Sequence, residues 1–418
     1  MAVSTGKVIF HKTKSFKIIG IILYCISPLI GLFYFIRGIA RKEIFAFYLL
    51  GAFFALFGAY LVPDSDAFSY REIYYSNVSF NYTILSIENK DFLYPLLSTF
   101  FNKLGFSFEA YRFLLLLFSY SSYIWMLLDI FKNNPNLTSN KKTYLYATYA
   151  MFFSVRLFTL AYGIRFGFAS TIVVISLYLF YKKSYLKAII FYLISTAMHF
   201  SILLILPLII YSFIASKLKI RPFMKIMIIL LLCVFANSAI EKIILTVMPN
   251  NELVQSVAEG YISGDWGTNS MIKLMSIGGL LFTIARILPI FPLGYFVLKD
   301  KTPSFLSNLS FAMIALLCVS FSSITILLRY SNIAIAISFL TMLVTYTANR
   351  KSFYKLKVAL FSFLFVFANY IYAQRVSLSV GYQFEAICFP LLVIDQPPYT
   401  DKWVNNNINI YTREVKPE

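Results

Sequence analysis

Long apolar runs, separated by short polar or basic stretches, recur along the whole chain. The pattern predicts apolar segments at residues 16–36, 43–62, 109–131, 143–162, 166–181, 185–198, 200–215, 225–247, 275–298, 305–327, 331–348 and 357–376. Many approach the ~20 residues that an α-helix needs to cross a bilayer. The runs are continuously apolar and do not alternate with period two, which argues against a membrane β-barrel. We therefore predict an all-α polytopic integral membrane protein with about 11–12 transmembrane or re-entrant helices.

Composition supports this class. Of 418 residues, 59% are hydrophobic and 13% are charged, and the mean hydropathy is +0.74. In a typical soluble domain, about a quarter of the residues are charged. No polar stretch is long enough for a separate soluble domain, so we expect one polytopic domain over residues 1–418. The Lys-rich N-terminus leads into a full-length apolar segment, unlike a cleavable signal peptide.

The basic residues lie in short clusters between apolar runs. These clusters are residues 37–42, 132–142, 182–187, 217–225, 299–301 and 350–357. The positive-inside rule places them in the cytoplasm, so the net charge of +19 gives no reason to expect nucleic acid as a partner. Segment 185–215 begins and ends beside such clusters. It therefore predicts a hairpin of two short helices that turns near His199-Phe200-Ser201. The first segment is either re-entrant around Pro28 or preceded by an N-terminus on the outside.

Three polar stretches are then expected on the non-cytoplasmic side. The first, residues 63–108, is rich in Asp, Tyr, Asn and Ser, and its part from Phe92 to Leu104 has the pattern of a short amphipathic helix lying in the interface. The second is residues 248–274, also with short amphipathic helices. The third is the polar C-terminal tail, 377–418, which we expect to carry little chemistry.

Several arginines lie away from the cytoplasmic clusters, inside apolar segments or at their outer ends. They are Arg156, Arg165, Arg286, Arg329 and Arg375. An arginine deep in a span costs several kcal/mol unless it faces a wet cavity or an anion, although it could also be structural, by helix pairing or snorkelling. Guanidinium groups bind phosphate oxygens bidentately. Arginines near one membrane face therefore suggest a polyanionic ligand such as a lipid diphosphate.

Carboxylates and tyrosines follow the second apolar segment. Asp66, Tyr70 and Tyr74 are spaced i, i+4 and i+8, so a helix would place them on one face, with Asp64 close by. Carboxylates and aromatic rings suit sugar recognition, but a capped interfacial helix with tyrosines at the headgroups gives the same pattern. His199, at the expected turn, is a candidate base or simply a satisfied residue at a helix break.

No cofactor is expected. The four cysteines have no metal or redox spacing, and two histidines do not suffice for a multi-histidine metal site. Arginines can supply the positive charge that the chemistry needs, so we expect no metal, although Asp64 and Asp66 have the oxygen ligands that a divalent ion prefers.

The order of these motifs resembles the EpsG-like branch of the Wzy polysaccharide polymerases. The resemblance is carried by Asp66-x-x-x-Tyr70-x-x-x-Tyr74, Gly163-Ile164-Arg165-Phe166-Gly167-Phe168-Ala169, Tyr181-Lys182-Lys183, Ala197-Met198-His199-Phe200-Ser201 and, further on, Arg329-Tyr330 before an apolar segment. It covers residues 43–215 well and the rest by the pattern of spans. The family usually has Gln where Phe166 stands, which bears on the polar contacts beside Arg165.

The resemblance implies a GT-C-like glycosyltransferase. Such an enzyme joins undecaprenyl-diphosphate-linked repeat units into O-antigen or a related surface polysaccharide at the periplasmic face of the bacterial inner membrane. Its expected partners are these lipid-linked glycans, membrane lipid and a chain-length regulator protein. Arg165 and Arg286 would stabilise the leaving diphosphate, and Asp66 or His199 would orient or deprotonate the acceptor hydroxyl. The expected substrate-binding residues are Asp64, Tyr70, Tyr74, Arg156, Arg329, Tyr330 and Arg375.

Three other functions stay open. A flippase or transporter of the same lipid-linked sugars predicts internal repeats of the spans, which the sequence does not display. An O-antigen ligase-type transferase shares the chemistry, and sequence separates it poorly from a polymerase. A membrane acyltransferase would need its catalytic residues to face a cytoplasmic acyl donor, whereas His199 is expected outside.

Overall fold

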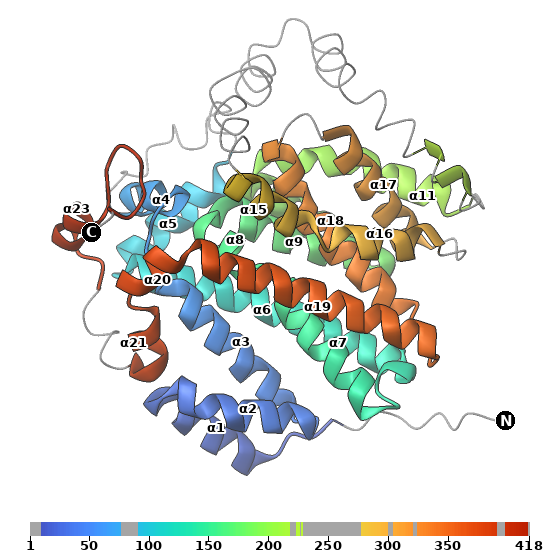
Figure 1. Cartoon of the computed structure of the whole chain (residues 1–418), viewed down its shortest axis with the longest axis horizontal. Helices are drawn as coiled ribbons and strands as arrows, with labels where there is room; N and C mark the ends of the chain where they lie inside the picture. The colour runs from blue at the N-terminus through green and yellow to red at the C-terminus, as the bar shows by residue number, and fades with distance from the viewer. Residues whose placement is uncertain are drawn as a thin grey trace, which may run out of the picture. The chain divides into compact units, whose positions relative to one another are not determined.

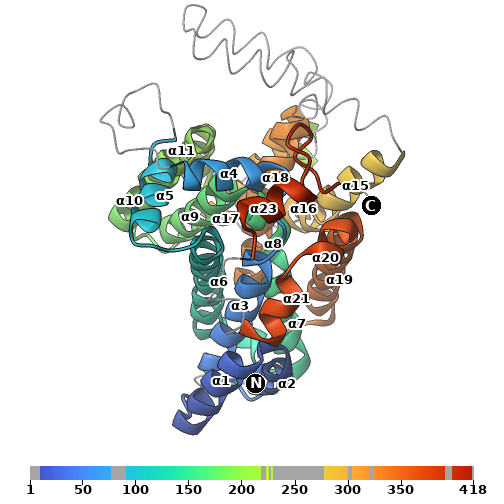
Figure 2. The same cartoon turned by 90° about the vertical axis from the view of Figure 1, so that its left-hand side faces the viewer.

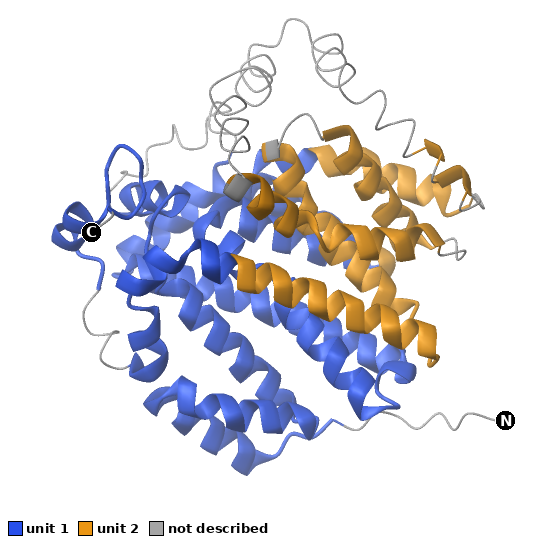
Figure 3. Ribbon diagram, viewed as in Figure 1, with its two compact units in different colours: residues 1–179, 184–203, 370–418 blue, residues 180–183, 204–369 orange. Residues whose placement is uncertain are grey.

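The structure is a computed structural model. It describes residues 10–76, 91–217, 223–225, 227–228, 277–299, 304–320, 324–390 and 398–416. The expected outer loop 248–274 and most of segment 225–247 lie outside the described residues. Within the described ranges the chain is helical, with no β-strand beyond two isolated bridges. It divides into two compact units, residues 1–179, 184–203 and 370–418, and residues 180–183 and 204–369 (Figure 3).

The all-α polytopic membrane fold is confirmed. Among the described residues, five helical segments are long and apolar enough to cross a membrane: α6 (Phe108–Asn133), α9 (Ile164–Tyr181), Gly279–Lys299, α18 (Ile324–Val344) and α19 (Arg350–Ala373). Shorter apolar helices accompany them, among them α2 (Pro28–Ala40) and α3 (Ile44–Ala59).

In the first unit, α3 packs along α6. Helices α1 (Lys14–Ile26) and α2 lie at one end of α3 (Figure 1), while α4 (Asp66–Tyr75), α5 (Leu93–Lys103) and α23 (Asp401–Asn407) lie at the other (Figure 2). Gly58, near the end of α3, allows this helix to pass close to its neighbours. A Cβ there would stand 2.5 Å from Cδ1 of Leu157 and 2.9 Å from Cδ1 of Leu116. The tight packing of α3 therefore fixes where its C-terminal end, and the loop after it, can lie.

The basic clusters of this unit gather at the end away from α4. The Tyr144 hydroxyl, near the start of α7 (Lys141–Ser154), donates to the Ile39 carbonyl at 2.8 Å, and the Lys42 ammonium lies 5.6 Å from the Tyr144 ring centroid. The Tyr178 hydroxyl, near the end of α9, donates to Asp129 at 2.6 Å, near the end of α6. Clusters 37–42 and 132–142 thus share one end of the unit.

The helix breaks at His199, as the sequence predicts. Helix α10 (Tyr185–Met198) ends there, and a 3-10 helix, η3 (Phe200–Ile205), leads to α11 (Leu206–Ala215). The Tyr192 hydroxyl donates to the carbonyls of Ile202 and Leu203, at 3.2 and 3.3 Å. These contacts bring the chain after His199 back along α10. The predicted amphipathic helix at Phe92–Leu104 is also present, as α5.

Three predicted segments are broken; for 143–162 and 275–298 the single-helix form is wrong. Segment 143–162 forms α7 and α8 (Leu157–Tyr162), with Arg156 between them. Segment 275–298 forms α15 (Ile277–Ile287) and α16 (Ile290–Lys299), because Pro289 has no N–H to continue the helix. The first segment breaks at Ser27, just before Pro28, between α1 and α2. Hydropathy cannot detect such breaks, since apolar residues continue through them.

The second unit has its own core. Helix α17 (Phe305–Val319) packs against α18 and α11. Val297, Phe311 and Ile314 form a buried cluster, and the hydroxyls of Ser310 and Thr341 lie 2.8 Å apart. The boundary between predicted segments 305–327 and 331–348 is displaced. Arg329 and Tyr330 lie inside α18 and not before it, because this helix already begins at Ile324.

The C-terminal tail is a packed part of the first unit. After α20 (Arg375–Val380) and α21 (Gln383–Cys388), residues 398–416 fold around α23. Tyr399, Val404 and Ile408 form one buried cluster with Val62 and Phe68. The residues that follow α3 therefore have the C-terminal segment as a neighbour.

Candidate functional site

Arg165 occupies the second position of α9. Its Nη1 donates to Oδ2 of Asp91 at 3.1 Å, and its Nε donates to the Tyr70 hydroxyl at 3.3 Å, with the Tyr70 ring centroid 5.4 Å from the guanidinium carbon. The side chain is 39% exposed. Among the described residues, no group accepts a hydrogen bond from its Nη2. The guanidinium is therefore held through Nε and Nη1, and its Nη2 can still donate a hydrogen bond to a ligand.

Gly167 sets the position of this arginine. A Cβ at Gly167 would stand 2.9 Å from Cα of Leu160 in α8 and 3.1 Å from the Thr159 carbonyl oxygen. Backbone atoms cannot move aside as a flexible side chain can. Only glycine lets the first turn of α9 approach α8 this closely, so the two glycines of the Gly163–Gly167 motif frame Arg165 for a packing reason.

Asp91 joins the separate parts of the site, and sequence reasoning misses it. One carboxylate oxygen pairs with Arg165. The other accepts from the Phe200 amide at 2.7 Å and lies 4.0 Å from Nδ1 of His199. Asp91 is one carboxylate of a polar loop, directly before α5. Its position at the start of a predicted helix is the one signal in the sequence that could have drawn attention to it.

His199 faces Asp91 at the end of α10. Its Nδ1 accepts from the Ser201 amide at 3.3 Å, and the Ser201 hydroxyl lies 3.0 Å from the same atom. A neutral ring with this pattern carries its proton on Nε2 and is a donor there. Phe166 packs edge-on against the ring, with centroids 5.3 Å apart. Phe166, the residue after Arg165, thus supports His199.

Helix α4 forms as predicted, but its residues differ in exposure. Asp66 is exposed in the first turn, one turn before Tyr70, whose ring packs on Tyr94 with centroids 5.2 Å apart. Tyr74 is 2% exposed; its ring stacks on Tyr111, and its hydroxyl donates to the Phe106 carbonyl at 2.7 Å. The expected sugar contact of Tyr74 does not fit this burial, because large aromatic side chains in the core serve packing.

Asp64 is also buried, with 4% of the residue exposed, so direct substrate binding does not fit it either. The Ser377 hydroxyl donates to its Oδ2. Burial raises the pKa of Asp64 to about 6, although Ser377 and Arg112 oppose the shift. Ser65, between buried Asp64 and exposed Asp66, has φ 53°, a left-handed conformation that is costly for a residue with a Cβ.

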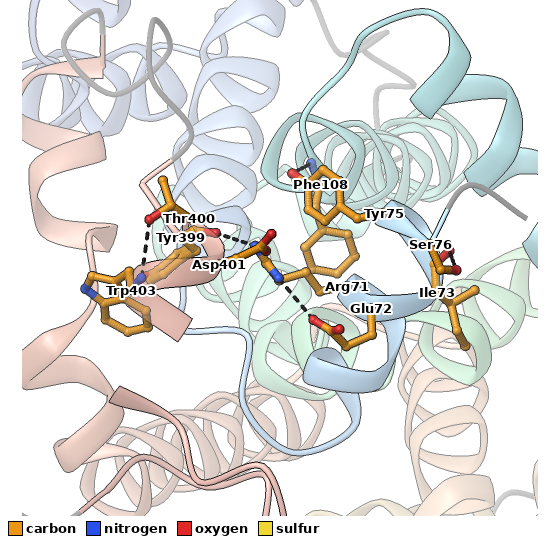
Figure 4. A network of polar contacts seen from close by, with 10 residues as sticks. All are labelled: Arg71, Glu72, Ile73, Tyr75, Ser76, Phe108, Tyr399, Thr400, Asp401 and Trp403. Carbon is orange, nitrogen blue, oxygen red and sulfur yellow. Dashed lines mark hydrogen bonds and ion pairs between the residues drawn. The ribbon is translucent and has the colours of Figure 1, made fainter. Parts of the chain in front are cut away.

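Sequence reasoning also misses two buried arginines: Arg112 holds the end of α3 and the loop after it, and Arg71 joins α4 to the C-terminal segment. Arg112 donates to the carbonyls of Leu61 and Gly58, at 2.9 and 3.2 Å. Arg71 donates to the Tyr399 carbonyl and to Asp401 (Figure 4). Arg112 lies inside predicted segment 109–131, so the rule that singles out arginines within apolar segments applies to it as well.

The remaining predicted residues have other surroundings in the described chain. Arg375 is exposed and donates to the carbonyl of Tyr372 in its own chain segment, at 3.0 Å. Arg156 lies at the break between α7 and α8. Arg286, Arg329 and Tyr330 belong to the second unit; there the Arg286 guanidinium carbon lies 5.6 Å from the Phe282 ring centroid, and Tyr330 is buried.

In the part of the chain that the structure describes, no group of three or more His, Cys, Asp or Glu side chains could hold a metal ion. The residues that the structure does bring together in the first unit are Arg165, Tyr70 and His199, with Asp91 between them. A fixed cation beside a carboxylate, an imidazole and a tyrosine suits the binding of a phosphate-containing ligand.

These features define a polytopic all-α membrane protein with a polar, arginine-containing site at the start of α9. Comparison with known families then places it further: the EpsG family model matches residues 43–384, and the chain belongs to this family. The family consists of Wzy-like polysaccharide polymerase-type proteins, so this chain is a polysaccharide polymerase-like membrane protein. No curated protein and no solved structure matches it.

Proposed function

We propose that the protein is a glycosyltransferase that polymerises oligosaccharide repeat units carried on undecaprenyl diphosphate. The donor is the growing chain on its lipid diphosphate, and the acceptor is a hydroxyl of the next lipid-linked unit. The observation that carries the proposal is the pairing of Arg165 with Asp91 and Tyr70, which leaves one guanidinium nitrogen without an acceptor in the described residues. Family membership supports the same reaction class.

The proposed step is a displacement at the anomeric carbon. The acceptor oxygen forms a bond to that carbon, the bond from the carbon to the diphosphate oxygen breaks, and the electron pair leaves with the diphosphate. Arg165 stabilises the negative charge that develops there, as positioned cations do. The hydroxyl proton goes to a carboxylate or to water.

We assign the carboxylate role to Asp66 in preference to His199. Asp66 is exposed, and it lies one helical turn from Tyr70, which contacts Arg165. His199 already accepts at Nδ1, so its neutral ring offers an N–H at Nε2 and suits donation to a phosphate or sugar oxygen. Asp91 fixes the Arg165 side chain relative to the backbone at Phe200.

The positive-inside rule supports a non-cytoplasmic site. In the first unit, clusters 37–42 and 132–142 lie at one end of the long helices, whereas Arg165 and α4 lie at the other. If the basic end faces the cytoplasm, the site faces the outside. A lipid diphosphate would reach it with its head at the interface and its tail in the bilayer.

Glycan length in a strain that lacks the gene tests the reaction class. A polymerase deletion should leave surface glycan of a single repeat unit. A flippase deletion would strand lipid-linked units inside, and a ligase deletion would leave long chains on the carrier lipid. Either of the last two results would contradict the proposal.

The arginine is tested in the same strain by complementation. Arg165→Ala should insert normally but reduce polymer by two or more orders of magnitude, since it removes the cation at the developing charge. Arg165→Lys should recover only part, because an ammonium lacks the bidentate fork. Arg350→Ala, an exposed arginine at the start of α19, is the matched control and should retain full polymer. Arg286→Ala is made in parallel, and full activity there would give Arg286 a structural role.

A further inference from the structure

The C-terminal segment 398–416 lies beyond residues 43–384, which match the family model. It nevertheless contacts the loop and helix that carry Asp66 and Tyr70. Tyr399, Val404 and Ile408 bury Val62 and Phe68, so the segment packs on both sides of the Asp64–Asp66 turn. The segment therefore packs on the loop and the helix that carry two candidate site residues.

Arg71 is the centre of these contacts (Figure 4). Its Nη2 donates to the Tyr399 carbonyl at 2.7 Å and to Oδ1 of Asp401 at 2.8 Å, and its Nη1 donates to Glu72 at 3.1 Å. Its guanidinium carbon lies 4.9 Å from the Tyr75 ring centroid. The Arg71 side chain is 3% exposed. A buried guanidinium with several acceptors has little freedom to move.

The segment is fixed to the loop as well as to α4. The Tyr399 hydroxyl donates to the Tyr60 carbonyl at 2.6 Å and accepts from the Tyr382 amide at 3.0 Å. The Ser65 amide, in its left-handed conformation, donates to the Arg413 carbonyl at 2.6 Å. The segment therefore contacts the chain at Tyr60, Ser65 and Arg71, just before and just after Asp66.

Arg71 and Tyr70 are neighbours in α4 that face different partners. Tyr70 contacts Arg165, whereas Arg71 contacts the C-terminal segment. Because a short helix moves as one body, the contacts of Arg71 set the place of Tyr70 and, one turn earlier, of Asp66. We infer that Arg71 is a positioning residue through which the C-terminal segment holds Asp66 and Tyr70 in place for glycosyl transfer. This inference rests on the proposed function.

The inference predicts a split between ligand binding and transfer. Arg165 stays held by Asp91 when α4 shifts, so affinity for a lipid diphosphate should change little. Transfer requires Asp66 to be correctly placed beside the acceptor hydroxyl, and a displacement of about 1 Å can lower the rate a hundredfold. A purely structural role for Arg71 would instead lower both quantities together.

The test compares Arg71→Gln and Tyr399→Phe with the wild-type protein. Glutamine keeps one donor for the Tyr399 carbonyl but loses the fork, and phenylalanine removes only the hydroxyl that reaches Tyr60. Polymer made in the complemented deletion strain should fall at least about tenfold for each. Affinity of the purified full-length protein for farnesyl diphosphate, measured by titration calorimetry, should stay within about twofold of wild type, and Arg71→Lys should recover part of the polymer.

Lys402→Gln is the matched control, because Lys402 is exposed next to Asp401 on α23; it should leave both quantities unchanged. Wild-type polymer in both Arg71→Gln and Tyr399→Phe would overturn the inference. So would an equal loss of polymer and of farnesyl diphosphate affinity in Tyr399→Phe. Arg165→Ala separates the two proposals. If Arg165→Ala retains polymer, the proposed function fails. If Arg165→Ala loses polymer while Arg71→Gln and Tyr399→Phe keep it, only the positioning role of Arg71 fails.

Discussion

Asp91→Asn changes one oxygen and one negative charge at the centre of the site. The asparagine carbonyl can still accept from the Phe200 amide, which now donates to Oδ1 at 2.7 Å. The amide nitrogen of asparagine would then face Arg165, where Oδ2 accepts at 3.1 Å. The substitution therefore removes the ion pair and spares the contact to the backbone.

The cost in stability should be small. A hydrogen bond to a charged group contributes about 1.5–3 kcal/mol, but Arg165 is 39% exposed and Asp91 18% exposed, so solvent screening reduces the value to about 1 kcal/mol. Asp91→Ala also leaves the Phe200 amide without its acceptor and should cost about 2 kcal/mol. Both variants should therefore accumulate in the membrane.

Asp91→Asn should reduce glycosyl transfer more than it reduces stability, and it should affect transfer and ligand affinity differently. Asp91 competes with a diphosphate for Arg165, so Asp91→Asn should leave affinity for farnesyl diphosphate unchanged or raise it. Transfer should fall about tenfold to a hundredfold, because the guanidinium is no longer fixed. The assay pairs glycan length in the complemented deletion strain with titration of the purified protein. Glu385→Gln, an exposed acid on α21, is the control. If Asp91→Asn lost affinity as far as Arg165→Ala does, Asp91 would belong to ligand binding, and this reasoning would be refuted.

Two further predictions concern protonation and orientation. Because burial raises the pKa of Asp64 from 3.8 to about 6, the folded protein retains a proton that the unfolded chain releases; this stabilisation is complete below pH 3.8, falls as pH rises through 6, and amounts to at most about 3 kcal/mol. Asp64→Asn should therefore gain thermal stability relative to wild type between pH 4 and pH 7 in detergent, and a constant difference would argue that Asp64 is not shifted. In a cysteine-free background, Lys103→Cys should react with an impermeant thiol reagent from outside and Ser139→Cys should not; the reverse would invert the proposed orientation.

Sequence alone predicts the features that depend on local pattern. The helix at Asp66–Tyr75, the amphipathic helix before Leu104 and the break at His199 all follow from spacing and from charge placement, and the structure contains each of them. Family membership likewise follows from motif order, because several short motifs in one order are specific although each alone is weak.

Features that depend on contacts distant in sequence could not be predicted. Asp91 acquires its importance from Arg165 and Phe200, which lie 74 and 109 residues further along the chain. The C-terminal segment reads as a polar tail, but Tyr399 and Val404 are buried by residues near position 62. Tyr70 and Tyr74 share a helix face and are both buried, and only their contacts distinguish them: Tyr74 stacks on Tyr111 of α6, whereas Tyr70 reaches Arg165.

Three arginines of the first unit, Arg71, Arg112 and Arg165, differ in the hydrogen-bond donors that they can offer to a ligand. Arg71 and Arg112 use both terminal nitrogens on acceptors of the chain and are almost completely buried. Arg165 uses Nε and Nη1, keeps Nη2 without an acceptor in the described residues, and is the exposed one of the three. The Nε atoms of Arg71 and Arg112 have no acceptor among the described residues, but both are buried, so an anion cannot reach them. The capacity to bind a diphosphate therefore depends on the remaining donor and on access, and among these three arginines Arg165 has both.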